Sequence, residues 1–291
     1  MPRSESVVSR FASLGWFAVS LAVAGLAACG SASPACPAAP AVKPGNAFLW
    51  TAQREGGPVL YLFGTIHDAA IEMVPAVALT AFDHSARIAT ELGDAQPDRD
   101  ELRDLERIAH GPGLDAMLGD DWWDLRDALR GTIHEDDLKR TRPWFALILL
   151  DGKNKGTPVV AMDTTLVERA TERKKPIDAM ESAADQMKAL DSVVTVEDLR
   201  AQLHSQRALQ CAYSDLVAAY AAGDEARITP YIVVDRTAEP LIYARNRAWI
   251  AKITSFHDTT FIAVGLGHML GEQGLPALLQ KAGYTIARVE K

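Results

Sequence analysis

Apolar residues gather in short runs that are separated by segments with helical spacing. Residues 48–52 and 59–63 flank the turn-rich sequence REGGP at 54–58, so we expect a hairpin that leads into a buried strand. Alternation of such runs with helical segments is typical of α/β proteins. Further runs predict strands at 87–90, 158–162, 176–180, 259–264 and 284–289.

Helical periodicity fills most of the sequence between these runs. Amphipathic segments dominate residues 98–150, which we interpret as a helical, lid-like insertion. The expected fold is therefore α/β, with a central mixed sheet fed by an N-terminal hairpin, flanking helices and this insertion. Helices are predicted at 75–85, 166–172, 195–222, 241–253 and 275–281, and residues 98–130 are expected to form two helical segments on either side of a break at GPG, 111–113.

The N-terminal 28 residues have the pattern of an export signal. Two arginines precede an apolar run at 11–28, and this run ends in the sequence LAAC. That ending resembles the lipobox of bacterial lipoproteins, which predicts cleavage before Cys29 and acylation of its thiol. Gly30 then favours the outer membrane, with the protein facing the periplasm. The run is also long enough for an uncleaved transmembrane anchor, which stays open as the alternative.

A tether and a folded body follow the predicted signal. Residues 29–45 are rich in alanine and proline and suit a semi-extended linker, so the folded body is expected over 46–291. An oxidising envelope would permit a disulfide between Cys36 and Cys211. The alternative is a free thiol in the tether and a buried helical cysteine.

Composition and charge narrow the classes of function. The chain has 291 residues, of which 48% are hydrophobic and 23% are charged, enough to bury a core without metal or disulfide support. The formal net charge of −8 disfavours non-specific binding to the negatively charged backbone of nucleic acid. We therefore expect no nucleic-acid partner.

Two of the predicted strands each lead into a Gly-x-x-His sequence. These are GTIH at 64–67 and GLGH at 265–268. A glycine permits a sharp exit from the strand, so His67 and His268 can turn back over the carboxyl edge of the sheet, where ligands usually bind. Their alternative role is as satisfied core histidines. A third copy, GTIH at 131–134, follows a helical segment and is expected on the surface.

Four further polar residues are candidates for the same edge. Glu91 ends a predicted strand, where a carboxylate needs a cation or donors unless it faces water. Glu181 also ends a strand and is either a base or second ligand, or a partner of the next helix start. Arg245 is placed to anchor a substrate carboxylate or a developing oxyanion. Asn246 lies in an apolar helical stripe, where it either bonds a site loop or holds the helix on the sheet.

Over residues 48–289 the chain resembles the TraB/GumN/Tiki family. The C-terminal block is the most specific part of the resemblance, because its glycines, its histidine and the helix that follows match the family in order and spacing. The matching segments are YLFGTIH at 61–67, ATELG at 89–93, RPW at 142–144, AMES at 179–182, ARNRAW at 244–249 and VGLGHMLGEQGLPALLQKAGYTIARV at 264–289.

The resemblance implies a metal-dependent protease, because the family's animal members are described in that way. It implies that His67, His268 and Glu91 are the metal ligands, with a divalent ion of zinc, manganese or cobalt as the cofactor. Two neutral imidazoles and one carboxylate leave open positions on such an ion, which lowers the pKa of bound water to about 7. Glu181 or bound hydroxide would then start the attack, and Arg245 would assist.

Several functions follow as hypotheses. The first is an envelope-anchored, metal-dependent hydrolase that cleaves a peptide or protein substrate and holds the bilayer through acylated Cys29. The second is a non-catalytic periplasmic binding or polysaccharide-export assembly lipoprotein, in which the histidines serve packing. An esterase-like hydrolase is a third, since fold analogy does not fix the reaction.

Overall fold

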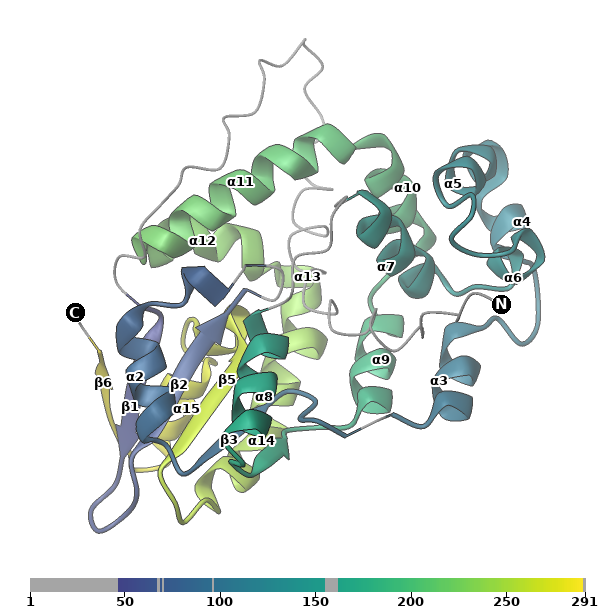
Figure 1. The fold of residues 1–291 in the computed structure, drawn as a ribbon. Helices are drawn as coiled ribbons and strands as arrows, with labels where there is room; N and C mark the ends of the chain where they lie inside the picture. The colour runs from purple at the N-terminus through teal and green to yellow at the C-terminus, as the bar shows by residue number, and fades with distance from the viewer. Residues whose placement is uncertain (1–46, 67–68, 70, 96, 155–161, 290–291) are drawn as a thin grey trace.

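A computed structural model describes residues 47–66, 69, 71–95, 97–154 and 162–289. Within them the chain forms one six-stranded mixed sheet in the order β4-β3-β5-β2-β1-β6 (Figure 1). The predicted fold class, α/β with a central mixed sheet and an N-terminal hairpin, is confirmed. The strands are β1 (Leu49–Gln53), β2 (Leu60–Thr65), β3 (Arg87–Thr90), β4 (Ile177–Ala179), β5 (Thr260–Gly265) and β6 (Thr285–Arg288).

Four neighbouring strands, β4, β3, β5 and β2, run parallel, and the hairpin strand β1 pairs antiparallel with both β2 and β6. Every residue of β5 is buried, as expected of a central parallel strand covered on both faces. The register sets Thr65 opposite Gly265 at the last rung between β2 and β5. Both Gly-x-x-His sequences therefore leave the sheet at the same edge.

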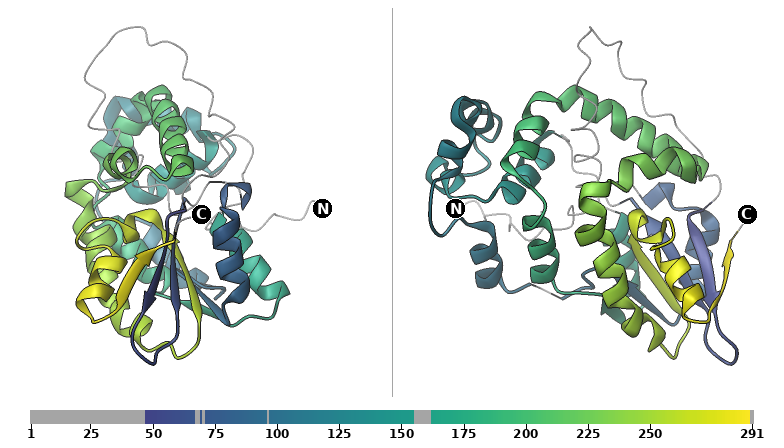
Figure 2. Two further views of the ribbon diagram at one scale, coloured as in Figure 1. Left: turned by 90° about the vertical axis from the view of Figure 1, so that its left-hand side faces the viewer. Right: turned by 180° about the vertical axis from the view of Figure 1, so that it is seen from behind.

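Helices cover both faces of the sheet. Figure 2, in its left-hand view, shows α2 and α8 on one face and α14 and α15 on the other. Phe82 of α2 packs edge-on against Phe261 of β5, with ring centroids 5.7 Å apart. On the other face, Trp249 and Ile253 of α14 are buried in the same core. These helices are α2 (Ala76–His84), α8 (Met162–Glu172), α14 (Ala244–Thr254) and α15 (Leu275–Lys281).

A second group of helices has its own hydrophobic core beside the sheet (Figure 1). Trp144 is fully buried there, and Leu241 and Ile242 join the group to the segment that precedes α14. The region predicted as a lid-like insertion is thus helical where it is described, and its movement stays a prediction. The group comprises α3 (Arg99–Glu106), α4 (Leu114–Leu118), η3 (Gly119–Asp121), α5 (Trp122–Ala128), α6 (Glu135–Lys139), α7 (Pro143–Asn154), α9 (Ala183–Asp191) and α10 (Val196–His204).

Two predicted elements differ from the structure. The single helix expected over 195–222 is broken at Ser205, whose backbone ends α10 before α11 begins. The strand expected at 158–162 falls largely outside the described residues, and its last residue, Met162, begins α8 instead. The remaining elements are η2 (Ile71–Met73), α11 (Gln206–Ala222), α12 (Glu225–Ile232), α13 (Asp235–Ala238), the π-helix η4 (Glu239–Tyr243) and η5 (Leu266–Met269).

Cys211 is a disulfide cysteine. The other two cysteines of the chain, Cys29 and Cys36, lie outside the described residues, as do the predicted signal and tether. Among the described helices, none combines the length and the hydropathy needed to cross a bilayer.

Candidate functional site at the carboxyl edge of the sheet

Strands β3 and β4 deliver two glutamates side by side. Their parallel ladder continues past the last paired residues, because the N–H of Glu181 donates to the carbonyl oxygen of Glu91 at 3.0 Å. The N–H of Met180 likewise donates to Thr90 at 2.8 Å. Both carboxylates therefore lie at the same edge, and each side chain is only 9% exposed. The sequence-predicted pair of strand-end acids is brought together.

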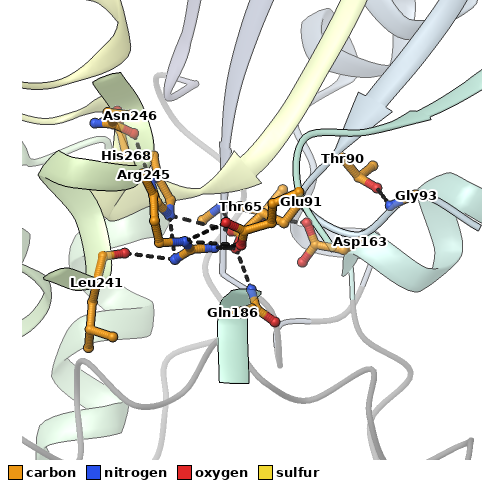
Figure 3. Close-up of polar contacts among 12 residues, drawn as sticks. Thr65, Thr90, Glu91, Gly93, Asp163, Gln186, Leu241, Arg245, Asn246 and His268 are labelled. Carbon is orange, nitrogen blue, oxygen red and sulfur yellow. Dashed lines mark hydrogen bonds and ion pairs between the residues drawn. The ribbon is translucent and has the colours of Figure 1, made fainter. Parts of the chain in front are cut away.

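Arg245 of α14 pairs with both carboxylates, and Figure 3 shows its guanidinium beside Glu91. Its Nε donates to both oxygens of Glu181, at 3.0 and 3.1 Å, and its second amino nitrogen bonds Glu181 and, at 2.5 Å, Oε2 of Glu91. The carbonyl of Leu241 in η4 accepts a bond from the other amino nitrogen at 2.7 Å. A buried carboxylate needs a positive partner, and among the described residues Arg245 is such a partner for Glu91.

A backbone N–H and a side-chain amide also donate to Glu91. Its Oε1 accepts from the N–H of Gly265 at 2.8 Å, and its Oε2 accepts from Nε2 of Gln186 at 2.8 Å. Gly265 is the last residue of β5, and Gln186 lies on α9, so the carboxylate is oriented from both the sheet and the second helical group (Figure 3). Such contacts fix the direction in which a ligand carboxylate presents its oxygens.

His268 lies in η5, just beyond β5, and is 4% exposed. Asn246 donates through Nδ2 to the carbonyls of His268 at 3.2 Å and Gln273 at 2.8 Å. Its Oδ1 must therefore face Nδ1 of His268, 2.7 Å away, and accept that nitrogen's proton. The neutral ring then carries its lone pair on Nε2, which accepts from Arg245 at 3.2 Å and lies 3.7 Å from Oε1 of Glu91.

Burial sets the electrostatics of this cluster. It raises the pKa of Glu181, an effect that Arg245 opposes and that the nearby charge of Glu91 reinforces. For Arg245 burial acts the other way, but the two carboxylates outweigh it and raise the pKa of the guanidinium. The site therefore holds a permanent cation beside a carboxyl group that takes up a proton more readily than in water.

Trp249 of α14 packs against two residues of the site, His268 and Arg245. Its ring packs against that of His268 with centroids 4.4 Å apart, and the guanidinium of Arg245 lies 5.0 Å over the same indole. Cation–π and aromatic contacts of this kind restrict the side-chain conformers of both partners. The imidazole and the guanidinium are thus presented to the sheet edge in fixed positions.

The structure assembles most of the predicted site residues. Glu91, Glu181, Arg245 and His268 meet at the carboxyl edge, and Asn246 bonds both His268 and Gln273 in the loop before α15. His67 lies outside the described residues, although the strand that leads to it is paired with the strand that leads to His268.

Two site residues were missed by sequence reasoning. Gln186 lies on the helix after β4, five residues beyond Glu181, where its amide gave no pattern to detect. Asp163, in the first turn of α8, accepts from Oγ1 of Thr65 at 2.7 Å and adds a third carboxylate near the ends of β2 and β3 (Figure 3). Sequence reasoning did not select Asp163, because it expected a strand at 158–162 and no helix that begins at Met162.

A separate group of ligand-type side chains lies in the second helical group. Asp121, Asp124 and His204 place one ligand atom each within 4.8 Å of one another, among the described residues. Asp121 already bonds His204 at 2.8 Å and Arg200 at 2.7 Å, and the His204 bond most strongly lowers its pKa. This group lies on η3, α5 and α10, away from the sheet edge (Figure 1), and Asp124 and His204 are exposed.

Comparison with known proteins identifies the family. The sequence model of the TraB/PrgY/gumN family matches residues 48–288, which contain the whole sheet and the site at its edge. The chain belongs to the TraB/PrgY/gumN family. The resemblance found in the sequence is thereby confirmed. No solved structure matches the chain.

Relatives of this TraB/PrgY/gumN chain include animal proteins named as metalloproteases. It is 23% identical to Metalloprotease TIKI2 of Danio rerio over 83% of the chain and 60% of that relative. It is 25% identical to Metalloprotease TIKI1 of Homo sapiens, over 83% of the chain and 61% of the relative. The chain therefore spans about three fifths of the length of these relatives.

The described residues suit a divalent ion in two respects. Nε2 of His268 is held as an acceptor by Asn246, and neutral imidazole in this tautomer is a common metal ligand. Oε1 of Glu91 lies 3.7 Å from it, so an imidazole nitrogen and a carboxylate oxygen converge on one point. A third ligand would have to come from elsewhere in the chain, and His67 is the residue that the family resemblance implies.

Proposed function

We propose that this TraB/PrgY/gumN protein is a metal-dependent hydrolase that cleaves peptide bonds in the cell envelope. The proposal rests on one observation above all. An imidazole lone pair, held on Nε2 of His268 by Asn246, converges with Oε1 of Glu91 at the carboxyl edge of the sheet. The animal relatives named as metalloproteases support peptide bonds as the class of substrate.

In this proposal, His268 and Glu91 hold the ion together with His67. A bound divalent ion supplies Lewis acidity and lowers the pKa of the water it binds to about 7. Zinc, manganese and cobalt all suit ligands of this type.

Glu181 is the proposed proton carrier. Burial raises its pKa, which brings the carboxyl group closer to the range in which a side chain both accepts and returns a proton. Arg245 orients Glu181 through its Nε and offers positive charge next to the site. A positioned guanidinium of this kind stabilises an oxyanion that develops at a carbonyl under attack.

The envelope part of the proposal comes from the sequence. The arginines, the apolar run and the LAAC ending of the first 29 residues support export and acylation at Cys29. We expect the full chain to enter the membrane fraction of a bacterial host with a labelled acyl group. Cys29→Ser should abolish labelling, and labelling that persists in this variant would contradict a lipid anchor.

Metal titration followed by a cleavage assay tests the enzymatic part. We expect calorimetry to show that the purified protein binds Zn²⁺, Mn²⁺ or Co²⁺, and that His268→Ala removes this binding. A peptide library should be cut only when the metal is restored. His204→Ala is the matched control, because it removes a histidine from the Asp121 group and leaves the sheet edge intact.

The outcomes separate the competing functions. Binding that survives His268→Ala but is lost in His204→Ala would move the metal site to the second helical group and contradict the proposal. No metal binding in the wild type, with peptides left intact, would favour the binding or polysaccharide-export assembly lipoprotein. Cleavage of ester but not peptide substrates would favour the esterase-like hydrolase.

A further inference from the structure

The guanidinium of Arg245 contacts both residues that would hold the proposed ion, at Nε2 of His268 and at Oε2 of Glu91. One amino nitrogen lies 3.2 Å from Nε2 of His268 and donates to its lone pair. The other donates at 2.5 Å to Oε2 of Glu91, the oxygen next to the Oε1 that faces His268. Arg245 thus forms ion pairs with both strand-end glutamates of this edge.

We propose that Arg245 is an internal competitor of the divalent ion and sets the affinity of the site for metal. The inference rests on the proposed function, because it concerns the same ligands. A lone pair that accepts from a guanidinium is not free for an ion, and two cations at this spacing repel each other. The ion therefore binds the fraction of molecules in which the guanidinium has withdrawn from Nε2.

The bonds of Arg245 to other groups allow such a withdrawal without unfolding the helix. Its Nε remains anchored to both oxygens of Glu181, and the carbonyl of Leu241 accepts from the same amino nitrogen that contacts His268. In the proposed withdrawal, the guanidinium rotates so that the contact with His268 breaks while these bonds persist. Glu91 keeps its donors from Gly265 and Gln186 throughout.

The affinity of the site for metal then depends on how often Arg245 occupies Nε2 of His268. When only a fraction of molecules is competent to bind, the apparent dissociation constant equals the intrinsic constant divided by that fraction. Removal of the guanidinium should therefore tighten metal binding, although it removes an ion pair from the metal-free protein. A residue that only supports the fold, or only assists the reaction, would not tighten binding when it is lost.

Calorimetric titration of the full-length protein with Zn²⁺, Mn²⁺ and Co²⁺ in separate runs tests this inference. We expect Arg245→Met to bind the preferred ion at least about tenfold more tightly than the wild type, which corresponds to about 1.4 kcal/mol. The double variant Arg245→Met with Glu181→Gln guards against misfolding, because it removes one positive and one negative charge together. Arg247→Met is the matched control, since Arg247 lies on the same helix but pairs with exposed Glu239.

Each result has a separate meaning. Tighter binding in both Arg245 variants, lost again on addition of His268→Ala, supports the competitor, as does binding that appears only when Arg245 is replaced. Equal or weaker binding in these variants, beside His268-dependent binding in the wild type, overturns the competitor and leaves the proposed hydrolase standing. No His268-dependent binding in any variant overturns both.

Discussion

Replacement of Arg245 by methionine should strongly destabilise the metal-free protein. The change leaves the carboxylates of Glu91 and Glu181, each 9% exposed, without their shared cation. Removal of one partner from a buried ion pair costs about 3–5 kcal/mol. Glu91 keeps bonds from Gly265 and Gln186, so we place most of the loss at Glu181 and expect about 3 kcal/mol.

The pH dependence of this loss follows from Glu181. Its pKa is raised in the folded protein by burial, so the stability that it contributes is full below its unfolded value of 4.5 and is lost as pH rises through the folded pKa. Without the opposing charge of Arg245 the folded pKa rises further. The difference between variant and wild type should therefore be largest near pH 8 and smallest near pH 4.5.

Urea unfolding with a chelator present, at several pH values, measures both effects. Arg247→Met is the control, since its exposed ion pair with Glu239 should contribute less than about 1 kcal/mol. A loss for Arg245→Met that is no larger than that of the control, or that does not change between these pH values, would refute the account of a buried charge cluster. Addition of Glu181→Gln to the variant should recover part of the loss.

Three further predictions concern single groups. Asn246→Leu removes the acceptor that holds the proton on Nδ1 of His268, so nitrogen NMR of that ring should show a smaller share of the Nδ1-protonated tautomer. An unchanged spectrum would contradict the role assigned to Asn246. Burial raises the pKa of Glu106 to about 7, so its stabilising effect is full below 4.5 and lost as pH rises through 7; Glu106→Gln should raise the melting temperature at pH 8 by about 2–4 °C, with no change at pH 4. A Cβ on Gly64 would lie 2.6 Å from a leucine methyl of η5, so Gly64→Ala should cost about 1–3 kcal/mol in urea unfolding, whereas Gly152→Ala, in open helical space, should cost nothing.

Much of the fold is visible in the sequence because the buried parallel strands have an unambiguous composition. The run at 259–264 is apolar on both faces and becomes β5, all of whose residues are buried. The two glutamates at strand ends, Glu91 and Glu181, were predicted to share a site because the carboxyl ends of parallel strands lie at one edge of the sheet. The break between α10 and α11 at Ser205 was not predicted, because apolar residues at helical spacing continue on both sides of it. No proline or glycine marks the break in the sequence.

The internal arrangement of the site could not be predicted in the same way. Arg245 and Glu91 are 154 residues apart, and only the packing of α14 beside the ends of β3 and β4 decides that they meet. The sequence pattern indicated that a buried Glu91 needs a cation or donors, and the family resemblance implied a metal ion for that role. Arg245 was instead expected to anchor a substrate carboxylate or a developing oxyanion. In the structure the guanidinium of Arg245 pairs with Glu91, a contact that no sequence pattern indicated, and the metal-ligand role of Glu91 stays a prediction.

Two neighbouring residues at the start of α14 contact the ring of His268. One fixes which nitrogen carries the lone pair, and the other donates to that lone pair. Asn246 directs that lone pair to Nε2, while the preceding residue, Arg245, donates to it. Both begin α14 immediately after the π-helix η4, whose carbonyl at Leu241 also holds the guanidinium. Because π-turns are wider than α-turns, a change of η4 toward regular α-helix would rotate both side chains together. The tautomer and the competing cation are therefore linked through the backbone, and neither can be altered by a movement of α14 without the other.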